Sequence, residues 1–364
     1  MELKFSIITV CYNEEKKIQS TIESVLNQGW KNYEHIIIDG KSEDLTMEIV
    51  QRYGERDKRI WWQSEEDNGI YNAMNKGISY TEGDFLCFLN AGDILYNDKV
   101  LETVAARIEE TNADIVYGDR IRTDSGQMNS SSYPIGANLP NYLKSRKNIC
   151  HQVIFASKES LKDGFDEQFK ICADYDWLCH QVIMERKTAK VDTIIVDFDA
   201  HGVTSQARYQ KIGLQESLKV VRKYFPEMRI WYYGEVENLI LQNIKNRMLY
   251  RCMNKWLVLK QRNVKISSFF IDRKLNTIAI YGFHHMGQRL YDELKDSPVK
   301  VAYVIDKNDS IAFSDLPVVQ REAKLEVIDA IIVTPICDFL EIKEDLAKRV
   351  KCKIISMEDV LFWE

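Results

Sequence analysis

Polar residues follow three short apolar runs of the sequence, at the points where the runs end. These residues occupy positions 9–13, 39–44 and 90–93. In an open parallel sheet, ligands bind beyond the carboxyl ends of the strands, so we expect the three segments to meet at one edge. An aspartate there can accept hydrogen bonds from a base or ribose, and another can hold Mg²⁺ or Mn²⁺ against a diphosphate. Each segment alone also suits a turn or a helix cap, but together they favour a nucleotide-diphosphate site.

Apolar runs that alternate with amphipathic segments predict the sheet that would position these residues. The runs are short and continuously apolar, as buried parallel strands are. They occupy residues 5–10, 34–38, 60–62, 84–89 and 114–117. Between the first two runs, Ile18, Ile22 and Val25 share one face of a predicted helix. This alternation is typical of an α/β fold with a mostly parallel sheet flanked by helices.

The 364 residues are enough for two domains, since a domain has about 150 residues. The segment 124–142 is rich in Ser, Asn, Gly and Pro and predicts a long loop, which could act as a lid. We expect a catalytic domain over residues 1–205 and a helical, basic connector over residues 206–270. A new apolar run at 276–281 begins a second, smaller α/β domain, expected over residues 271–364.

The composition excludes several classes of protein. Apolar residues make up 45% and charged residues 29%, which is ordinary for a globular protein. The net charge of -6 disfavours nucleic acid as a partner. The eight cysteines form no CxxC pair, which favours a reducing cytoplasm. Because no uncharged apolar run approaches about 18 residues, we expect any contact with the inner face of the cell membrane to be peripheral.

Five segments together resemble family-2 glycosyltransferases with the GT-A fold. They occupy residues 6–14, 38–44, 67–77, 83–93 and 174–177. The resemblance spans residues 3–205 in the family's order and is nearest to bacterial enzymes that build cell-surface polysaccharides. It implies an inverting transfer of a hexose or N-acetylhexosamine from a nucleotide-diphospho-sugar to a glycan or polyprenyl-linked acceptor.

The resemblance also implies roles for individual residues. Asp39 would contact the base, and Asp67 would lie near the nucleotide and the sugar. The expected donor-binding residues are Thr9, Tyr12, Asn13, Glu14, Asp39, Asp67, Asn90 and His151. Asp93 matches the last acidic position of the family's DxD motif and would hold Mn²⁺ or Mg²⁺. The motif departs from the family pattern at Asn90, which replaces an acidic residue.

Asp174 aligns with the family's catalytic base, near the start of a predicted helix. There a carboxylate could take the proton of an acceptor hydroxyl, although an aspartate at that place also suits a helix cap. Asp176 lies two positions on, which directs it to another side of the helix. His151 is either near the active site or a buried, hydrogen-bonded histidine. His201 resembles a residue of the segment that closes over the diphosphate, as a metal or phosphate ligand, and otherwise is a solvated turn residue.

The span 238–271 contains basic residues and no acidic residue. Its seven basic residues are Lys245, Arg247, Arg251, Lys255, Lys260, Arg262 and Lys265. Interleaved with an apolar stripe, they predict either a helix on an anionic membrane surface or a packed helix with a solvated basic face. The sequence leaves a homo-oligomer open.

The C-terminal region contains part of a dinucleotide-binding pattern. Gly282 follows a predicted strand, Gly287 lies in the helix that comes next, and Asp306 ends another strand 19 positions later. His284 occupies the position where a glycine would let the backbone approach a pyrophosphate. We therefore expect a small Rossmann-like unit that is either nucleotide-binding or structural. The alternatives to a transferase are a catalytically weak scaffold protein of polysaccharide assembly and, as a third hypothesis, an oxidoreductase.

Overall fold

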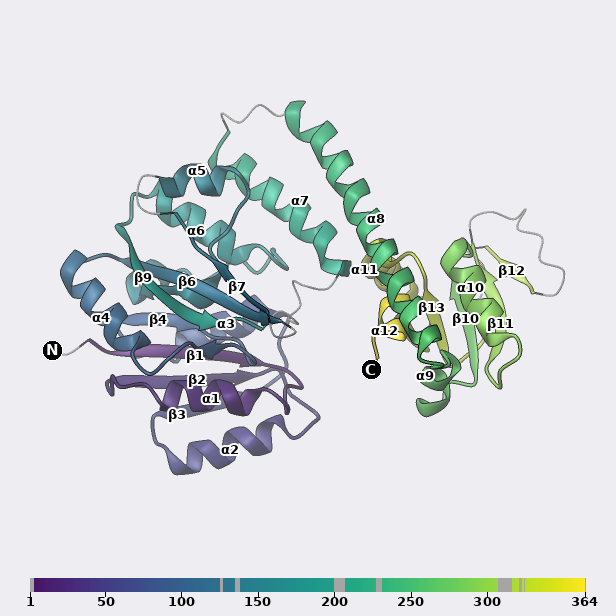
Figure 1. Cartoon of the computed structure of the whole chain (residues 1–364), viewed down its shortest axis with the longest axis horizontal. Coiled ribbons are helices and arrows are strands. Elements are labelled where there is room, and N and C mark those ends of the chain that lie inside the picture. The colour runs from purple at the N-terminus through teal and green to yellow at the C-terminus, as the bar shows by residue number, and fades with distance from the viewer. Residues whose placement is uncertain are drawn as a thin grey trace. The chain divides into compact units, whose positions relative to one another are not determined.

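The structure of the protein is a computed structural model, which describes residues 3–124, 127–134, 138–199, 207–226, 231–306, 316–320, 323 and 325–363. The chain divides into two compact units (Figure 1). The first unit comprises Met1–Ser205 and Ile212–Tyr233, and the second comprises Gln206–Lys211 and Gly234–Glu364. The helices of the predicted connector are thus distributed between the two units.

A nine-stranded sheet forms the centre of the first unit, in the order β3-β2-β1-β4-β8-β6-β9-β5 with β7 paired to β6. Its parallel half consists of β1 (Phe5–Cys11), β2 (Tyr33–Asp39), β3 (Ile60–Ser64) and β4 (Phe85–Phe88). The other half consists of β5 (Ile94–Leu95), β6 (Ile115–Asp124), β7 (Gln127–Ser131), β8 (Ile154–Ser157) and β9 (Thr188–Asp197). The antiparallel strand β8 joins the two halves by pairing with β4 and β6. This confirms the predicted mostly parallel α/β fold.

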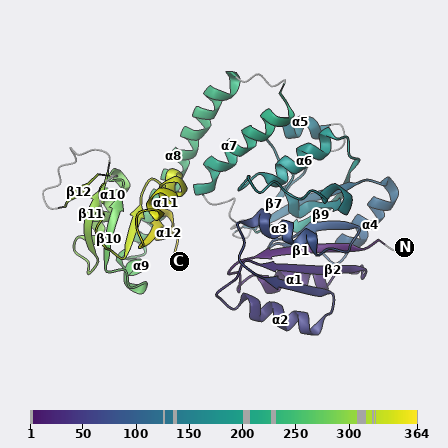
Figure 2. The same ribbon diagram turned by 180° about the vertical axis from the view of Figure 1, so that it is seen from behind.

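Helices cover both faces of this sheet (Figures 1 and 2). Those of the first unit are α1 (Ile18–Leu26), α2 (Thr46–Arg56), α3 (Ile70–Ser79), α4 (Val100–Thr111), α5 (Leu139–Lys144), α6 (Ala173–Ile183) and, from Ile212 on, α7 (Ala207–Tyr224). Helices α1 and α2 share a core with Ile37, whereas Gly77 of α3 lies against Ile8 and Ile38. Ile37 and Ile38 point to opposite faces because side chains alternate along a strand.

The predicted long loop 124–142 in fact includes β7 and the beginning of α5. Strand β7 pairs antiparallel with β6, so its Ser and Asn residues form part of a hairpin. The polar composition did not indicate this pairing, because backbone hydrogen bonds to a neighbouring strand do not require apolar side chains.

The register of the parallel strands brings their carboxyl ends together. Cys11 pairs with Asp39, and Asp39 pairs with Ser64 on its other side. Strand β4 ends beside β1, where the N–H of Ala91 donates to the carbonyl of Val10. The three polar segments singled out in the sequence therefore lie at one edge of the sheet.

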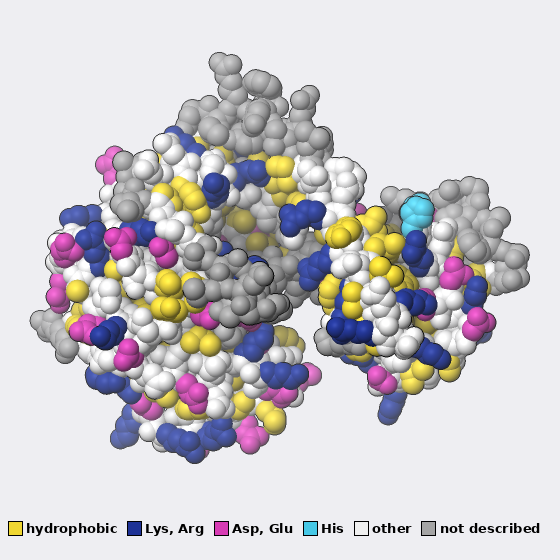
Figure 3. Space-filling view, in the orientation of Figure 1, with side chains coloured by type: hydrophobic (Ala, Val, Ile, Leu, Met, Phe, Trp, Pro, Cys, Tyr) yellow, Lys and Arg dark blue, Asp and Glu magenta, His cyan; other side chains and the backbone are white. Residues whose placement is uncertain are grey.

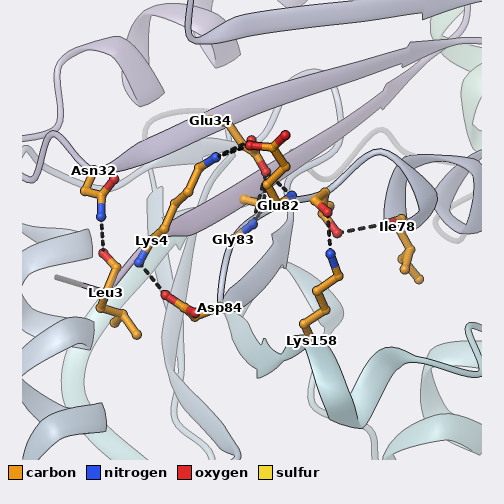
Figure 4. A network of polar contacts seen from close by, with 11 residues as sticks. Leu3, Lys4, Asn32, Glu34, Ile78, Glu82, Gly83, Asp84 and Lys158 are labelled. Atoms are coloured by element: carbon orange, nitrogen blue, oxygen red, sulfur yellow. Dashed lines mark hydrogen bonds and ion pairs between the residues drawn. The ribbon is translucent and has the colours of Figure 1, made fainter. Parts of the chain in front are cut away.

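The opposite edge is held by a network around Glu34 (Figure 4). The Lys4 Nζ lies 2.8 Å from the Glu34 Oε2, and the Ser6 Oγ donates to the Glu34 Oε1 at 2.6 Å. Gly83 donates its N–H to the Ser6 Oγ at 2.9 Å, and the Lys4 N–H donates to Asp84 at 2.9 Å. Burial alone would raise the pKa of Glu34, but the hydrogen bonds from Lys4 and Ser6 outweigh it and hold the pKa below its usual value. This network fixes β1 against β2 and β4.

The second unit contains a five-stranded parallel sheet in the order β12-β11-β10-β13-β14. Its strands are β10 (Thr277–Tyr281), β11 (Lys300–Ile305), β12 (Val318–Val319), β13 (Ala330–Val333) and β14 (Lys353–Ser356). Its helices are α8 (Trp231–Gln261), α9 (Ser267–Asp272), α10 (His285–Leu294), α11 (Phe339–Ala347) and α12 (Met357–Leu361). This arrangement fits the small α/β domain that the sequence predicted.

Helix α8 uses its apolar stripe for packing within the second unit. Met248, Cys252, Trp256 and Leu259 lie in the core of that unit with the strand residue Ile280. Burial in this core therefore accounts for the apolar stripe. This agrees with the prediction of a packed helix, one of the two interpretations of the sequence. On the face shown in Figure 3, basic and apolar side chains lie together over the second unit. Among the described residues, no helix combines the length and apolarity that a membrane span requires.

Because Gly83 is tightly packed in this network, we predict that a methyl group added there lowers the stability of the fold strongly. A Cβ at Gly83 would lie 2.7 Å from the Ser6 nitrogen and 2.8 Å from the Phe5 carbonyl carbon, which are backbone atoms of β1. We expect Gly83→Ala to lower the free energy of unfolding by more than about 2 kcal/mol. The measurement is urea unfolding followed by circular dichroism.

Gly213→Ala is the matched control, because a Cβ there meets only Ile171 at 3.5 Å. Gly213 lies inside α7, where alanine should stabilise the helix by about 0.5–1 kcal/mol. Equal stability of the Gly83→Ala variant and the wild type would contradict the packing described for this edge.

Candidate active site

Two strand-end segments are joined by hydrogen bonds at the carboxyl edge of the large sheet. The Asn13 N–H donates to the Ser42 Oγ at 2.8 Å, and the Glu43 N–H donates to the Asn13 Oδ1 at 2.9 Å. Asn13 has a φ of 55°, a left-handed conformation that asparagine tolerates better than most residues. The Glu14 N–H donates to the Thr46 Oγ1 at 2.8 Å. The turn after β1 and the loop after β2 thus form one connected platform.

Asp39 lies fully buried beneath this platform. Its Oδ2 accepts the Ser42 N–H at 3.0 Å and the Ser64 hydroxyl at 2.6 Å. The carboxylate therefore ties the loop after β2 to the end of β3 and shapes the floor of the site.

Gly40 allows two of the predicted donor-binding side chains to approach each other. A Cβ at Gly40 would lie 2.6 Å from the Asp67 Oδ2 and 3.4 Å from the Tyr12 Cδ2. Asp67 accepts the Gly69 N–H at 2.8 Å, at the start of α3. Tyr12 is 58% exposed, so its ring offers a face on which a base can stack.

Thr9 lies inside the protein, away from this surface. It is fully buried, and its hydroxyl lies 2.9 Å from the His35 Nε2. Burial lowers the pKa of His35 to about 3, so the imidazole is neutral at physiological pH. Thr9 can influence a bound donor only through the strand that contains it.

Asp93 is a buried carboxylate beyond the end of β4. It is 2% exposed, and burial raises its pKa to about 6. Its Oδ1 accepts the Asp199 N–H at 2.9 Å, and its Oδ2 accepts the Gln152 Nε2 at 3.1 Å. The carboxylate oxygens thus have two hydrogen bonds and no cationic side chain bonded to them among the described residues.

Lys17 connects the platform to the region of Asp93. Its Nζ lies 2.6 Å from the Asp199 Oδ2 and 3.7 Å from the Glu14 Oε2. Burial alone would lower the pKa of Lys17, but the hydrogen bond to Asp199 and the nearby Glu14 charge raise it. Gly92, with a φ of 104°, lies beneath this ion pair, since a Cβ there would lie 2.8 Å from the Asp199 Oδ2. Lys17 and Asp199 therefore form an ion pair against Gly92, the residue before the buried Asp93.

A chain of hydrogen bonds links Asn90, His151, Asp174 and Tyr71. The Asn90 Nδ2 lies 3.2 Å from the His151 Nε2, and the His151 Nδ1 lies 3.2 Å from the Asp174 Oδ2. The Tyr71 hydroxyl lies 2.7 Å from the Ile171 carbonyl oxygen and 3.1 Å from the Asp174 Oδ1, so its one proton is shared between the two acceptors. Asp174 is 8% exposed. His151, from the turn before β8, and Tyr71, from α3, thus meet at the Asp174 carboxylate of α6, and Asn90, which follows β4, contacts His151 from behind.

Asp174 and Asp176 have different surroundings although both lie in the first turn of α6. Asp174 accepts the Tyr175 N–H at 2.8 Å, so it also has a local backbone contact. Asp176 instead lies 2.9 Å from the Lys223 Nζ and accepts the Tyr224 hydroxyl at 3.3 Å. The two carboxylates point to different sides of the helix, and only Asp174 contacts the histidine.

A small cavity lies against the His151–Asp174 pair. It is lined by Leu86, Phe88, His151, Ile154, Ala156, Leu161, Phe165, Asp174 and Trp177. All of these residues except His151 and Asp174 are apolar or aromatic. The two polar side chains therefore lie in a water-poor environment, where their interaction is stronger than at an open surface.

The residues around Asp93 suit a divalent cation that is shared with a substrate. No three His, Cys, Asp or Glu side chains gather as a metal site in the described part of the chain, and His201 lies outside the described residues. Mg²⁺ nevertheless needs only one or two carboxylates when phosphates supply other ligands. Asp93 offers a carboxylate whose charge is disfavoured by burial, and the Asn90 Oδ1 is buried without a hydrogen-bond partner.

Several residues of this site were missed in the sequence. Tyr71 lies within the segment 67–77 that carried the resemblance, and Gln152 directly follows His151, an expected donor-binding residue, so their positions were a usable signal. Lys17 and Asp199 had no such signal, because their contact joins residues 182 positions apart.

Comparison with known proteins gives matches in the same part of the chain. The model of the family "Glycosyl transferase family 2" matches residues 6–163. A PGL/p-HBAD biosynthesis glycosyltransferase of Mycobacterium tuberculosis is 32% identical over 178 residues, covering 48% of this chain and 67% of the relative. An uncharacterized glycosyltransferase of the same species is 30% identical over 213 residues, covering 55% and 76%.

Among solved structures, TarS of S. aureus in complex with UDP-GlcNAc has a TM-score of 0.50 and 18% sequence identity. The match covers 61% of this chain and 68% of TarS, and it supports the same fold. With the family match and the two mycobacterial relatives, it leads to one conclusion: this chain belongs to glycosyltransferase family 2, and its first unit has the GT-A fold.

Proposed function

We propose that this glycosyltransferase moves a sugar from a nucleotide-diphospho-sugar to a hydroxyl group of its acceptor, with inversion at the anomeric carbon. The observation that carries the proposal is the buried Asp174 carboxylate, held by His151 and Tyr71. The carboxylate lies at the start of α6, and its partner His151 lies in the turn directly before β8, the strand that pairs with β4.

In this proposal the platform binds the nucleotide. Tyr12 stacks on the base, Asp39 supports the loop beneath it, and Asp67 lies toward the ribose and the sugar. Asn90 lies between the platform and the Asp174 carboxylate, because it follows β4 and contacts His151. Lys17 supplies positive charge near the diphosphate.

Asp174 acts as general base in a single displacement. Its carboxylate takes the proton from the acceptor hydroxyl while the hydroxyl oxygen forms a bond to the anomeric carbon. The bond from that carbon to the diphosphate breaks on the opposite face. His151 and Tyr71 fix the carboxylate, and the apolar wall of the cavity excludes water that would compete with the acceptor.

Asp93 would hold Mn²⁺ or Mg²⁺ in this proposal, with His201 as a second candidate ligand. The cation would neutralise the charge that develops on the departing nucleoside diphosphate. Ionised Asp93 provides the carboxylate, and the Asp199 and Gln152 hydrogen bonds orient it.

The acceptor we propose is a glycan or a polyprenyl-linked saccharide of cell-surface polysaccharide synthesis. The mycobacterial relative is named for PGL/p-HBAD biosynthesis, which supports a biosynthetic role for the transfer. A polyprenyl-linked acceptor requires contact with the inner face of the membrane. Exposed basic residues of α8, such as Arg247 and Arg251, support a peripheral contact with anionic lipid.

A donor panel tests the binding half of the proposal. We expect UDP-GlcNAc or another UDP- or GDP-sugar, with Mn²⁺, to raise the melting temperature by several degrees, because a ligand at a hundred times its Kd stabilises by about 2.7 kcal/mol. UDP-GlcNAc is the first donor to test, since TarS was crystallised with it. NAD should give no shift.

The Asp93→Asn variant should lose the part of the shift that depends on Mn²⁺, and chelation by EDTA should do the same to the wild type. Equal absence of a shift across the whole nucleotide panel would count against a sugar-nucleotide enzyme.

Substitution at Asp174 tests the catalytic half. We expect Asp174→Asn to lower kcat at least about 100-fold while donor binding is kept, because an amide cannot accept the acceptor's proton. The measurement combines release of nucleoside diphosphate with the donor-induced melting shift.

Asp176→Asn is the matched control on the same turn of α6. It removes the pair with Lys223, so it should lower the melting temperature but leave kcat within a few-fold of the wild type. Turnover retained in Asp174→Asn would remove this carboxylate from the mechanism.

A further inference from the structure

Arg120 is a half-buried cation with no acidic partner among the described residues. It lies on β6, where its backbone pairs with Val196 of β9. Its guanidinium carbon lies 4.6 Å from the centre of the Phe198 ring. Its other neighbours are the Cys150 thiol and the phenol groups of Tyr133 and Tyr142.

The pocket around Arg120 is built from ordered contacts. The Tyr133 hydroxyl donates to the Cys150 Sγ at 3.4 Å, and the Tyr133 and Tyr142 rings meet edge to face with centres 6.3 Å apart. Tyr133 is 6% exposed. Arg120 thus presents a planar guanidinium, with its five N–H donors, among aromatic rings and a thiol that satisfy few of them.

Such a cation is costly to keep without a counter-ion. A partly buried charge loses hydration, and a ring face and a thiol replace only part of that loss. Phosphate and carboxylate groups match the fork of a guanidinium by accepting two parallel hydrogen bonds. The surroundings of Arg120 therefore suit an anionic ligand.

The order of the strands indicates which substrate would carry this anion. From β2 the sheet continues through β1, β4 and β8 to β6. The platform lies at β1 and β2, Asp93 follows β4, His151 precedes β8, and Arg120 lies on β6. Cys150, which neighbours Arg120, is adjacent in sequence to His151. Arg120 therefore lies on a strand further from the nucleotide platform than His151, and in the proposed reaction the acceptor hydroxyl reaches Asp174 from this side.

We propose that Arg120 binds an anionic group, a phosphate or a carboxylate, that the acceptor carries close to the hydroxyl that reacts. This inference rests on the proposed transferase function, because it takes Asp174 as the base and the platform as the nucleotide site. It identifies the acceptor class as an acidic or phosphorylated saccharide. Arg120 would then contribute to acceptor selection and leave donor binding unchanged.

The test measures ligand binding to the full chain by isothermal titration, with UDP and Mn²⁺ present at saturation to fill the donor site. The probes are glucose 1-phosphate, methyl glucuronide and the neutral methyl glucoside. We expect at least one charged probe to bind about ten-fold or more tighter than methyl glucoside in the wild type. Preference for the phosphate probe assigns a phosphorylated acceptor, and preference for the glucuronide assigns an acidic sugar.

Arg120→Gln should remove this preference, and Arg120→Lys should keep part of it, because lysine retains the charge without the fork. The matched control is Arg107→Gln, because Arg107 is an arginine that already has an acidic partner, Glu110 on α4. The Arg107→Gln variant should bind all three probes as the wild type does. Melting temperatures of the variants establish that each is folded.

Equal binding of charged and neutral probes to the wild type would overturn the inference, and so would an unchanged preference in Arg120→Gln. Loss of UDP binding in Arg120→Gln would assign the residue to the donor instead, which also overturns it. Failure of the wild type to bind UDP would be a failure of the proposed function, and the same titration series detects it separately.

Discussion

The hydrogen-bonded chain from Asn90 through His151 to Asp174 is the constraint on which the rest of the site depends. Its members come from the end of β4, the turn before β8 and the start of α6. Because β8 pairs with β4 and β6 and joins the two halves of the sheet, this chain also connects the parallel half, which contains the proposed nucleotide platform, to the second half. A shift of either half would separate the carboxylate from its histidine. The fold therefore has to position these elements before any acceptor chemistry is possible.

The two ends of the parallel strands have carboxylates whose pKa values are shifted in opposite directions. At the amino edge, Lys4 and Ser6 satisfy Glu34, and its pKa lies below the usual value. At the carboxyl edge, burial raises the pKa of Asp93 to about 6. The folded state thus binds a proton at Asp93 more tightly than the unfolded chain does, so stability falls as the pH rises from the unfolded pKa of 3.8 to the folded pKa of about 6, and ionised Asp93 carries the full cost above that pH. We interpret this cost as the consequence of keeping a carboxylate ready for a cationic partner.

The sequence predicted the strand-end segments and Asp174, because each lies where an apolar run or a helix begins or ends. It did not predict that Thr9 is buried against His35, since a strand residue gives no signal for the face it occupies when both faces are covered. Nor did it predict the contact of Lys17 with Asp199, or the pocket of Arg120, because these depend on residues far apart in the chain. From the sequence, the apolar stripe of α8 suited either a membrane surface or a protein core. In the structure the stripe packs in the core of the second unit.

The central claim is that Asp174 deprotonates an acceptor hydroxyl that displaces the nucleoside diphosphate in one step. The stereochemistry of the product tests it most directly. With a donor whose sugar is α-linked to the diphosphate, the anomeric proton coupling measured by NMR should identify a β-linked product. An α-linked product would require a second displacement or a front-face reaction, and would contradict the role assigned to the His151–Asp174 pair.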